Sequence, residues 1–367
     1  MQALILAGGE GTRLRPLTST VPKPVVPLVD RPFIAYMIEW LRGHGVDDVI
    51  LACGFMADGV RSVLGDGSSL GVRLRYIEEP APLGTGGALK YAEELLDDRF
   101  FMLNGDVLTD MDLTAQVRQH EQTGARATLA LIAVDDPATY GLVRLDADLA
   151  VREFVEKPGP EEVGTCLINA GAYILEREVL EGLAPAGTKI SIEREVFPTL
   201  VDNGLYGYGA SGYWMDIGTP ERYLQATFEI LEGEVRTEVG RAVAEAGGVL
   251  RHGGEGAGIL HGPALVGSGC DLAPDAVVGS RSVLGRDVTV GKAAHIESSV
   301  VLDGATVGAG TRITSSIIGP GARIGDHCRI EGRVMLGQGV TVGSCNTLLQ
   351  GMRIFPGVEL PDGAIAF

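Results

Sequence analysis

Residues 4–18, "LILAGGEGTRLRPLT", join an apolar run to a glycine-rich turn that ends in arginines. The run "QALILA" at residues 2–7 has the composition of a buried β-strand, and the glycines follow it directly. Because glycine has no Cβ, backbone N–H groups in such a turn can closely approach the oxygens of a phosphate. The stretch therefore predicts a first strand that leads into a phosphate-binding turn.

Two common phosphate-binding motifs do not match this turn. No Lys-Ser or Lys-Thr pair follows the glycines, as a Walker A turn requires, and Leu14 stands where a dinucleotide fingerprint has its third glycine. An ordinary strand-to-helix turn would explain one pair of glycines. This turn adds Arg13, and Lys23 follows between two prolines in "VPKP". The two prolines constrain the backbone at Lys23, which favours a functional role for this lysine over an idle, solvated one.

The first 230 residues alternate predicted strands with predicted helices. "DVILAC" (48–53), "RLRYIE" (73–78) and "FFMLNG" (100–105) are short β-rich runs, and residues 33–45 and 86–98 have helical patterns. This alternation predicts an α/β domain with a mainly parallel sheet covered on both faces. Residues 234–257 are rich in Gly, Glu and Ala with little periodicity, and we interpret them as a connection between domains.

A different period governs the rest of the chain. From Val266 to Leu302 an aliphatic residue recurs every six positions, and the repeat resumes from Ile318 to Leu360 after two five-residue steps separated by one of six. Three short strands per coil, with the aliphatic residues stacked inside, explain this repeat. A β-sandwich would instead show alternation of period two. The domain resembles the left-handed hexapeptide-repeat β-helix.

Composition limits the class of protein. A chain of 367 residues suits two domains, and a net charge of −18 disfavours nucleic acid and anionic membranes as partners. No apolar run has the length of a membrane span, and the amino terminus is a strand rather than a signal peptide. Five scattered cysteines without C-x-x-C spacing favour neither disulfides nor zinc, so we expect a cytoplasmic protein.

Several motifs in order carry a family resemblance. After "LAGGEGTRLRPLT" and "PKP" come "EEPAPLGTGGAL" (78–89), "LNGDVL" (103–108), "FVEKP" (154–158), "NAGAYIL" (169–175), "SIEREVFPTLV" (191–201) and "YWMDIGTPERY" (213–223). Together they resemble the sugar-1-phosphate nucleotidyltransferases, and most closely the two-domain GDP-mannose pyrophosphorylases. The resemblance implies a Rossmann-like nucleotidyltransferase catalytic domain at 1–233, a linker at 234–257 and the β-helix at 258–367.

The resemblance also implies a reaction and a set of site residues. A sugar 1-phosphate oxygen attacks the α-phosphorus of a nucleoside triphosphate and expels pyrophosphate, with Mg²⁺ and cations reducing the repulsion between the two anions. Arg13 and Lys23 would be catalytic, and Asp106 and Asp216 would bind the metal. The implied nucleotide-binding residues are Leu6, Ala7, Gly8, Gly9, Gly11, Thr12, Arg13, Lys23, Glu79, Gly84, Thr85 and Asp106. The implied sugar-phosphate-binding residues are Gly141, Glu156, Lys157, Asn169 and Gly171.

The base preference depends on "EEPAPLGTGG". Relatives that use UTP or dTTP tend to have Gln where this chain has Glu79. A glutamate offers only acceptors, which suits the N1–H and N2–H₂ donors of guanine, so we expect GTP, provided that Glu79 and not Glu78 faces the base. The sugar is expected to be mannose 1-phosphate. Glucose-1-phosphate thymidylyl-, uridylyl- and adenylyltransferases remain alternatives.

The repeat domain raises further alternatives. Some hexapeptide β-helices are acyltransferases with a catalytic histidine, and His295 and His327 lie in the repeats. Neither has a long insertion loop nearby that could form an acyl-CoA site, and a surface turn explains both. A non-catalytic regulatory subunit would not need Arg13, Lys23 or Asp106. We expect the β-helix to mediate homo-oligomerisation, because its flat faces and uncapped ends suit stacking between subunits.

Overall fold

The computed structural model describes residues 1–367 except 55, 135–136, 138–139, 156–165, 254–256 and 367. The chain divides into two compact units, each built from two segments. The first unit contains Met1–Glu10 and Ile34–Trp214, and the second contains Gly11–Phe33 and Met215–Phe367. The glycine-rich turn therefore passes from one unit to the other between Glu10 and Gly11.

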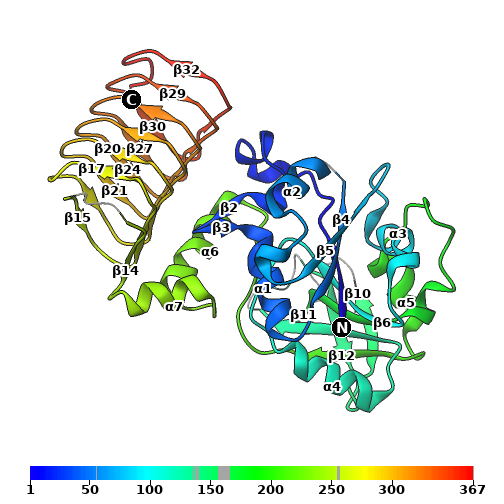
Figure 1. The fold of residues 1–367 in the computed structure, drawn as a ribbon. Coiled ribbons are helices and arrows are strands. Elements are labelled where there is room, and N and C mark those ends of the chain that lie inside the picture. The colour runs from blue at the N-terminus through cyan, green and yellow to red at the C-terminus, as the bar shows by residue number, and fades with distance from the viewer. Residues whose placement is uncertain (55, 135–136, 138–139, 156–165, 254–256, 367) are drawn as a thin grey trace. The chain divides into compact units, whose positions relative to one another are not determined.

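A nine-stranded sheet forms the first unit (Figure 1). Its main path is β10-β9-β11-β6-β1-β4-β5, and β8 pairs with β11 and β12. Strands β6, β1, β4 and β5 are parallel, whereas β11 is antiparallel to β6 and β8. The strands are β1 (Gln2–Leu6), β4 (Asp48–Cys53), β5 (Arg73–Glu78), β6 (Arg99–Asn104), β8 (Ala127–Ala133), β9 (Leu142–Leu145), β10 (Val151–Val155), β11 (Leu167–Glu176) and β12 (Leu205–Gly209). The Rossmann-like α/β prediction is confirmed, with a parallel centre and antiparallel additions.

The core of this unit explains its strand sequences. Leu4, Phe100 and Tyr173 are fully buried members of one cluster, as expected for strands covered on both faces. The helices are α1 (Phe33–Gly43), α2 (Ala57–Leu64), α3 (Gly84–Tyr91), α4 (Leu113–Thr123) and α5 (Phe197–Leu200). The helix predicted over 86–98 begins two residues earlier and ends at Tyr91, and a separate 3₁₀ turn follows at Glu93–Leu95. Short strands β2 (Pro27–Leu28), β3 (Arg31–Pro32), β7 (Val107–Thr109) and β13 (Trp214–Asp216) complete the described strands before α6.

Two helices of the second unit precede the repeats. Helix α6 (Pro220–Glu232) has Thr219 as its N-cap, whose hydroxyl accepts the N–H of Arg222, and it ends before Gly233 at φ 79°. The segment 234–257, which we interpreted as an unpatterned connection, contains helix α7 (Glu238–Glu245) and strand β14 (Val249–Arg251). An eight-residue helix spans little more than two turns, so its periodicity is weak in the sequence.

The repeats form three parallel sheets, consistent with a left-handed β-helix (Figure 1). The first contains β14, β16 (Ala264–Val266), β19 (Ser282–Leu284), β22 (Val300–Val301), β25 (Ile317–Ile318), β28 (Met335–Leu336) and β31 (Arg353–Ile354). The second contains β15 (Ile259–Leu260), β18 (Val277–Val278), β21 (His295–Glu297), β24 (Arg312–Thr314), β27 (Arg329–Glu331) and β30 (Thr347–Leu349). The third contains β17 (Asp271–Leu272), β20 (Thr289–Val290), β23 (Thr306–Val307), β26 (Arg323–Ile324), β29 (Thr341–Val342) and β32 (Glu359–Leu360).

The strand register corrects one position of the predicted repeat. Leu284 is aligned with Val301, and Val301 with Ile318, so the inward residue of that coil is Val301 rather than Leu302. Both residues are buried, which is why the sequence alone did not distinguish them. One of the five-residue steps therefore falls between Ile296 and Val301.

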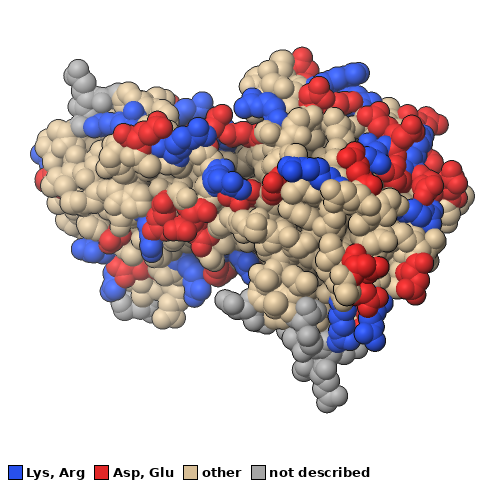
Figure 2. All heavy atoms as spheres, turned by 90° about the horizontal axis from the view of Figure 1, so that it is seen from below, with Lys and Arg blue, Asp and Glu red and all other residues tan. Residues whose placement is uncertain are grey.

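The cysteines and the surface charges can be compared with the composition. All five cysteines are free thiols, and burial raises the pKa of Cys53 to about 12. On the described surface drawn in Figure 2, Lys and Arg side chains lie among Asp and Glu side chains rather than in one large basic area.

Within the described ranges, the structure contains no helix with both the length and the apolar character of a membrane span.

Candidate functional site

The parallel strands of the first unit place several predicted site residues at one edge of the sheet. Strands β4 and β5 lie on one side of β1, and β6 lies on the other, so the strand order reverses beside β1. Open α/β sheets bind ligands outside the carboxyl ends of the strands at such a reversal. Gly8 and Gly9 follow β1, Glu79 follows β5, and Asp106 follows β6. The fold thus brings these predicted residues to the edge where a ligand is expected.

Close backbone packing explains Gly8. A Cβ on Gly8 would lie 3.2 Å from Glu79 Oε1, and one on Gly54 would lie 3.0 Å from the carbonyl oxygen of Gly8. Of the two candidate glutamates, Glu78 is exposed, whereas Glu79 is partly buried beside Gly8. Glu79 Oε2 accepts the N–H of Leu83 at 3.1 Å. Burial raises the pKa of Glu79, and this hydrogen bond opposes that shift without cancelling it.

The glycines of "GTGG" have a structural explanation. Gly84 has a φ of +74°, and a Cβ on it would lie 2.6 Å from the carbonyl oxygen of Ile190. The N–H groups of Gly86 and Gly87 both donate to that oxygen, at 2.9 and 3.2 Å. These glycines therefore allow the start of α3 to pack directly against the segment around Ile190.

A polar network fixes the neighbouring Thr85. Its hydroxyl donates to Glu193 Oε2 at 2.7 Å and accepts the N–H of Ile192 at 2.9 Å. Ser191 Oγ also donates to Glu193 Oε2, at 2.8 Å. These residues belong to the motif "SIEREVFPTLV", and their role could not be predicted because only the fold brings them to residues 84–87.

A tight crossing positions Asp106. The N–H of Gly105 donates to the carbonyl oxygen of Leu6 at 2.9 Å, and a Cβ on Gly105 would lie 2.5 Å from that oxygen. Because β11 is antiparallel to β6, the residues early in β11 lie at the carboxyl end of β6. A Cβ on Gly171 would lie 2.8 Å from Asn104 Nδ2. The "NAG" motif is therefore close to the residues that precede Asp106.

Asn169 fixes an irregularity in β11. Its Oδ1 accepts the N–H of Gly171 at 3.1 Å, and its Nδ2 donates to the hydroxyl of Tyr173 at 2.8 Å. The backbone N–H of Asn169 donates to the carbonyl oxygen of Gly141 at 2.9 Å, so these two predicted sugar-site residues are in direct contact. The pairing of β11 with β8 shifts between Asn169 and Tyr173. Asn169 thus stabilises the local backbone of β11.

Two aromatic residues lie beside this irregularity and were not predicted as site residues. The Nε1–H of Trp214 donates to the carbonyl oxygen of Ala170 at 2.8 Å. The ring of Tyr140 packs edge-to-face on Trp214 with 5.4 Å between the ring centroids. Trp214 was quoted within "YWMDIGTPERY", and its contact with residue 170 could not be read from the sequence.

The second unit contains the cationic part of the turn. Gly11 has a φ of +62° and begins a 3₁₀ turn over Thr12–Leu14. A Cβ on Gly11 would lie 3.0 Å from Lys23 Cβ, and Thr18 Oγ1 donates to the carbonyl oxygen of Gly11 at 2.7 Å. Lys23 is only 8% exposed. A solvated surface lysine would not be so buried, so the turn and Lys23 form one packed structure.

Arg13 lies beside the "DIGTPER" segment of the same unit. Its side chain is exposed, and a Cβ on Gly218 would lie 2.7 Å from Arg13 Nη2. Two residues before Gly218, Asp216 Oδ1 is 3.3 Å from Arg222 Nη1. Asp216 was predicted as a site residue and Gly218 was not, although the lack of a side chain on Gly218 leaves room for the Arg13 guanidinium.

Some predictions are not tested by this geometry. Glu156 and Lys157 lie outside the described residues. Asp106 and Asp216 are partly buried carboxylates of the first and second units, and such oxygen ligands fit Mg²⁺. Within the described part of the chain, no group of three or more His, Cys, Asp or Glu residues could hold a metal. In general, Mg²⁺ combines one or two protein carboxylates with substrate phosphates and water.

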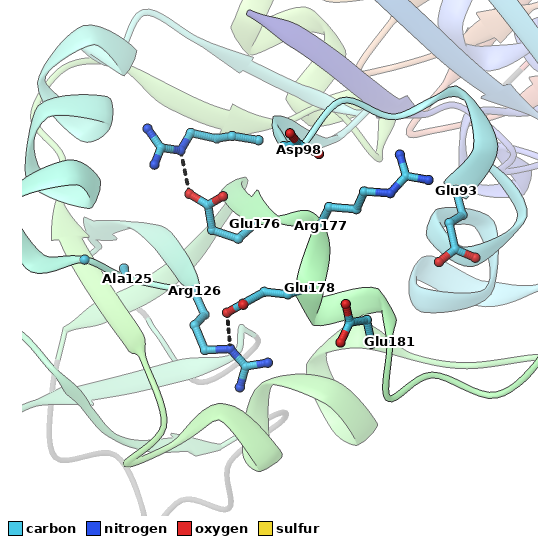
Figure 3. A pocket seen from close by; sticks show the side chains of 10 residues that line it. Glu93, Asp98, Ala125, Arg126, Glu176, Arg177, Glu178 and Glu181 are labelled. Atoms are coloured by element: carbon cyan, nitrogen blue, oxygen red, sulfur yellow. Dashed lines mark hydrogen bonds and ion pairs between the residues drawn. The ribbon is translucent and has the colours of Figure 1, made fainter.

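A pocket of about 620 Å³ lies at the opposite edge of the first unit's sheet (Figure 3). Arg99 and Arg126, which line it, are paired with Glu176 and Glu178, each at 2.6 Å. The lining has three arginines and five carboxylates, which gives it an excess of negative charge: Glu93, Asp98, Arg99, Arg126, Glu176, Arg177, Glu178 and Glu181. It contains none of the predicted site residues and does not suit a polyanionic substrate.

Models of two known domain families match this chain. A model of the nucleotidyl transferase family matches residues 2–233, and a model of the GMPPB C-terminal domain matches residues 260–363. The chain belongs to the nucleotidyl transferase family. It is accordingly a nucleotidyltransferase enzyme, and the predicted reaction class is confirmed.

Three similar proteins illustrate the range of the family. A mannose-1-phosphate guanylyltransferase of Mycobacterium tuberculosis is 38% identical over 100% of this chain and 98% of its own length. A UTP–glucose-1-phosphate uridylyltransferase of Synechocystis is 32% identical over 83% of each chain. The crystal structure of HddC from Yersinia pseudotuberculosis, complexed with GMP-PN, is 31% identical and covers 61% of this chain and 97% of its own, with a TM-score of 0.52.

Proposed function

We propose that this nucleotidyltransferase converts GTP and mannose 1-phosphate into GDP-mannose and pyrophosphate. The observation that carries the proposal is the similarity, along the full length of both chains, to the mannose-1-phosphate guanylyltransferase of M. tuberculosis. The packed turn of Gly11, Arg13 and Lys23 supports the proposal, because the reaction needs positive charge beside the triphosphate. The uridylyltransferase of Synechocystis makes UTP with glucose 1-phosphate the second candidate pair.

The reaction requires positioning and charge neutralisation rather than a protein nucleophile. A phosphate oxygen of the sugar 1-phosphate forms a bond to the α-phosphorus, and the bond from that phosphorus to the pyrophosphate oxygen breaks. The exposed guanidinium of Arg13 would bind the outer phosphates and so the departing pyrophosphate. Lys23 would neutralise charge at the α-phosphate, and the N–H groups of residues 8–12 would bind the remaining oxygens.

The metal would be held by Asp106 and Asp216 together with substrate oxygens. When bound, Mg²⁺ supplies positive charge that lowers the repulsion between the two phosphate groups. The Gly105 contact with Leu6 limits the positions that Asp106 can adopt, and Arg222 balances the charge of Asp216.

Guanine recognition would depend on Glu79. Its carboxylate lies beside Gly8, close to where the first strand ends, and the exposed Glu78 does not. Two acceptor oxygens match the adjacent N1–H and N2–H₂ donors of guanine, whereas uracil and thymine offer one donor between two acceptors. Gly84 and Thr85 would contact the same base or its ribose.

The sugar phosphate would be bound by the remaining predicted residues. Lys157 would hold its phosphate, and Glu156, Gly141, Asn169 and Gly171 would contact the sugar. We further propose that the protein acts in the cytoplasm and that the β-helix joins subunits into a homo-oligomer, with residues 234–257 connecting it to the catalytic domain.

Pyrophosphate release from GTP, mannose 1-phosphate and Mg²⁺ tests the proposal. The wild-type protein should release pyrophosphate, and Lys23→Ala should lower kcat/KM by about 100-fold or more, the usual cost of removing one preorganised charge contact. Lys90→Ala is the matched control, because Lys90 of α3 is also largely buried but donates to the carbonyl oxygen of Leu180 and pairs with Glu93. Wild-type protein without GTP-dependent release, or equal activity in both variants, would contradict the proposal.

A further inference from the structure

One face of the β-helix carries a column of buried apolar side chains. The register of the sheet that begins with β14 stacks one such residue per coil, and each is at most 2% exposed: Leu265, Val283, Val300, Ile317 and Met335. Their strand neighbours, such as Val266 and Leu284, belong to the interior cluster of the solenoid. Since successive side chains of a strand point to opposite faces, the column faces outward and is covered by another part of the chain.

Two ion pairs join helix α6 to this part of the β-helix. Near its end, Glu232 Oε1 is 2.6 Å from Arg281 Nε, and near its start, Glu221 Oε1 is 3.7 Å from Arg333 Nη1. Glu232 lies eleven positions after Glu221 in the helix, which corresponds to about 16 Å along its axis. Arg281 and Arg333 lie three coils apart, and neighbouring strands are about 4.8 Å apart, so the distance between them along the β-helix is about 14 Å. The two lengths agree, so α6 lies across the coils with its amino end toward the later ones.

The column changes character at its last position. The register aligns Arg353 of β31 with Met335, so an arginine stands where the five preceding coils have an apolar residue. Arg353 Nη1 donates to the carbonyl oxygens of Arg13 and Arg15, each at 3.0 Å. These two oxygens flank the last residue of the 3₁₀ turn Thr12–Leu14. A single guanidinium nitrogen of Arg353 therefore binds the backbone on both sides of Leu14, in the turn that carries Arg13.

We propose that Arg353 is a positioning residue, through which the β-helix fixes the conformation of the phosphate-binding turn. The proposal rests on the proposed function for its kinetic consequence. Arg353 uses backbone oxygens, so it constrains the turn without occupying the Arg13 guanidinium. Without the Arg353 contact the turn adopts further conformations. The apparent affinity for GTP then falls in proportion to the fraction of molecules whose turn can still bind the phosphates.

Three variants measured by steady-state kinetics test this consequence. Arg353→Ala should raise the KM for GTP about fivefold to tenfold while kcat and the KM for mannose 1-phosphate change less than about twofold. Arg353→Lys retains a cationic donor on a long side chain and should recover most of the GTP affinity. Arg323→Ala is the matched control, because Arg323 is an exposed arginine at the first position of the two-residue strand β26.

Hydrogen exchange of the nucleotide-free proteins tests the contact without relying on turnover. Arg353→Ala should increase exchange in residues 11–19, where the N–H of Leu14 bonds to Gly11 and that of Arg15 bonds to Thr12, and Arg323→Ala should not. If the wild type lacks GTP turnover but exchange rises as expected, the proposed function fails and the positioning contact stands. Unchanged exchange and unchanged KM, or increased exchange throughout the β-helix, would overturn the positioning role.

Discussion

Replacement of Gly84 by alanine should destabilise the first unit by about 2–5 kcal/mol. A side chain at the observed φ of +74° costs about 1–2 kcal/mol. The new Cβ would also lie 2.6 Å from the carbonyl oxygen of Ile190, a backbone atom that no rotamer change can move away. Shifting packed backbone to relieve such overlap typically costs about 1–3 kcal/mol more.

Gly124→Ala separates these two contributions. Gly124 ends α4 with a φ of +59°, and nothing lies within 4 Å of the position that a Cβ would occupy there, so only the backbone cost applies. Trp40 and Trp214 are the two tryptophans of the chain and both belong to the first unit, so tryptophan fluorescence reports its unfolding in urea. Gly84→Ala should have a midpoint lower than that of Gly124→Ala by roughly 1 M. Equal midpoints would refute the packing argument at Ile190.

Three further predictions concern other parts of the chain. Asn346→Ala should destabilise the last coils by roughly 2–4 kcal/mol, because the buried amide donates to Gly343 and Pro361; faster hydrogen exchange confined to those coils would show it. Burial lowers the pKa of His120 despite its hydrogen bond to Glu176. As the pH falls, His120 is therefore protonated in the unfolded chain at a higher pH than in the folded chain. Stability should therefore fall as the pH drops below about 6.5, and the urea midpoint of His120→Gln should depend less on pH there. Glu79→Gln should reduce the preference for GTP over dTTP, and an unchanged ratio of kcat/KM values would reject the base-recognition argument.

Local sequence patterns predicted the main elements of both domains. The strands over 48–53 and 73–78 match β4 and β5 at both ends, because strand-forming residues fill the middle of each run and Gly54 or Glu79 follows it. The six-residue repeat predicted the solenoid because each coil places the same side-chain type inside. Helix α7 was missed, since eight residues give too few turns for a clear period.

Contacts between segments that are distant in the chain could not be predicted from the sequence. Residues such as Gly84 and Gly218 are small because Ile190 and Arg13 lie against them, and nothing near them in the chain shows this. The inward residue Val301 could not be distinguished from its buried neighbour Leu302 without the strand register. Arg353 is the clearest case, because its partners lie more than 300 positions earlier in the chain.

The most direct test of the central claim is a substrate matrix. ATP, GTP, UTP and dTTP would each be incubated with mannose 1-phosphate or glucose 1-phosphate and Mg²⁺, and initial rates of pyrophosphate release compared at subsaturating concentrations. The account predicts the highest kcat/KM for GTP with mannose 1-phosphate. A higher kcat/KM for UTP or dTTP with glucose 1-phosphate would contradict it.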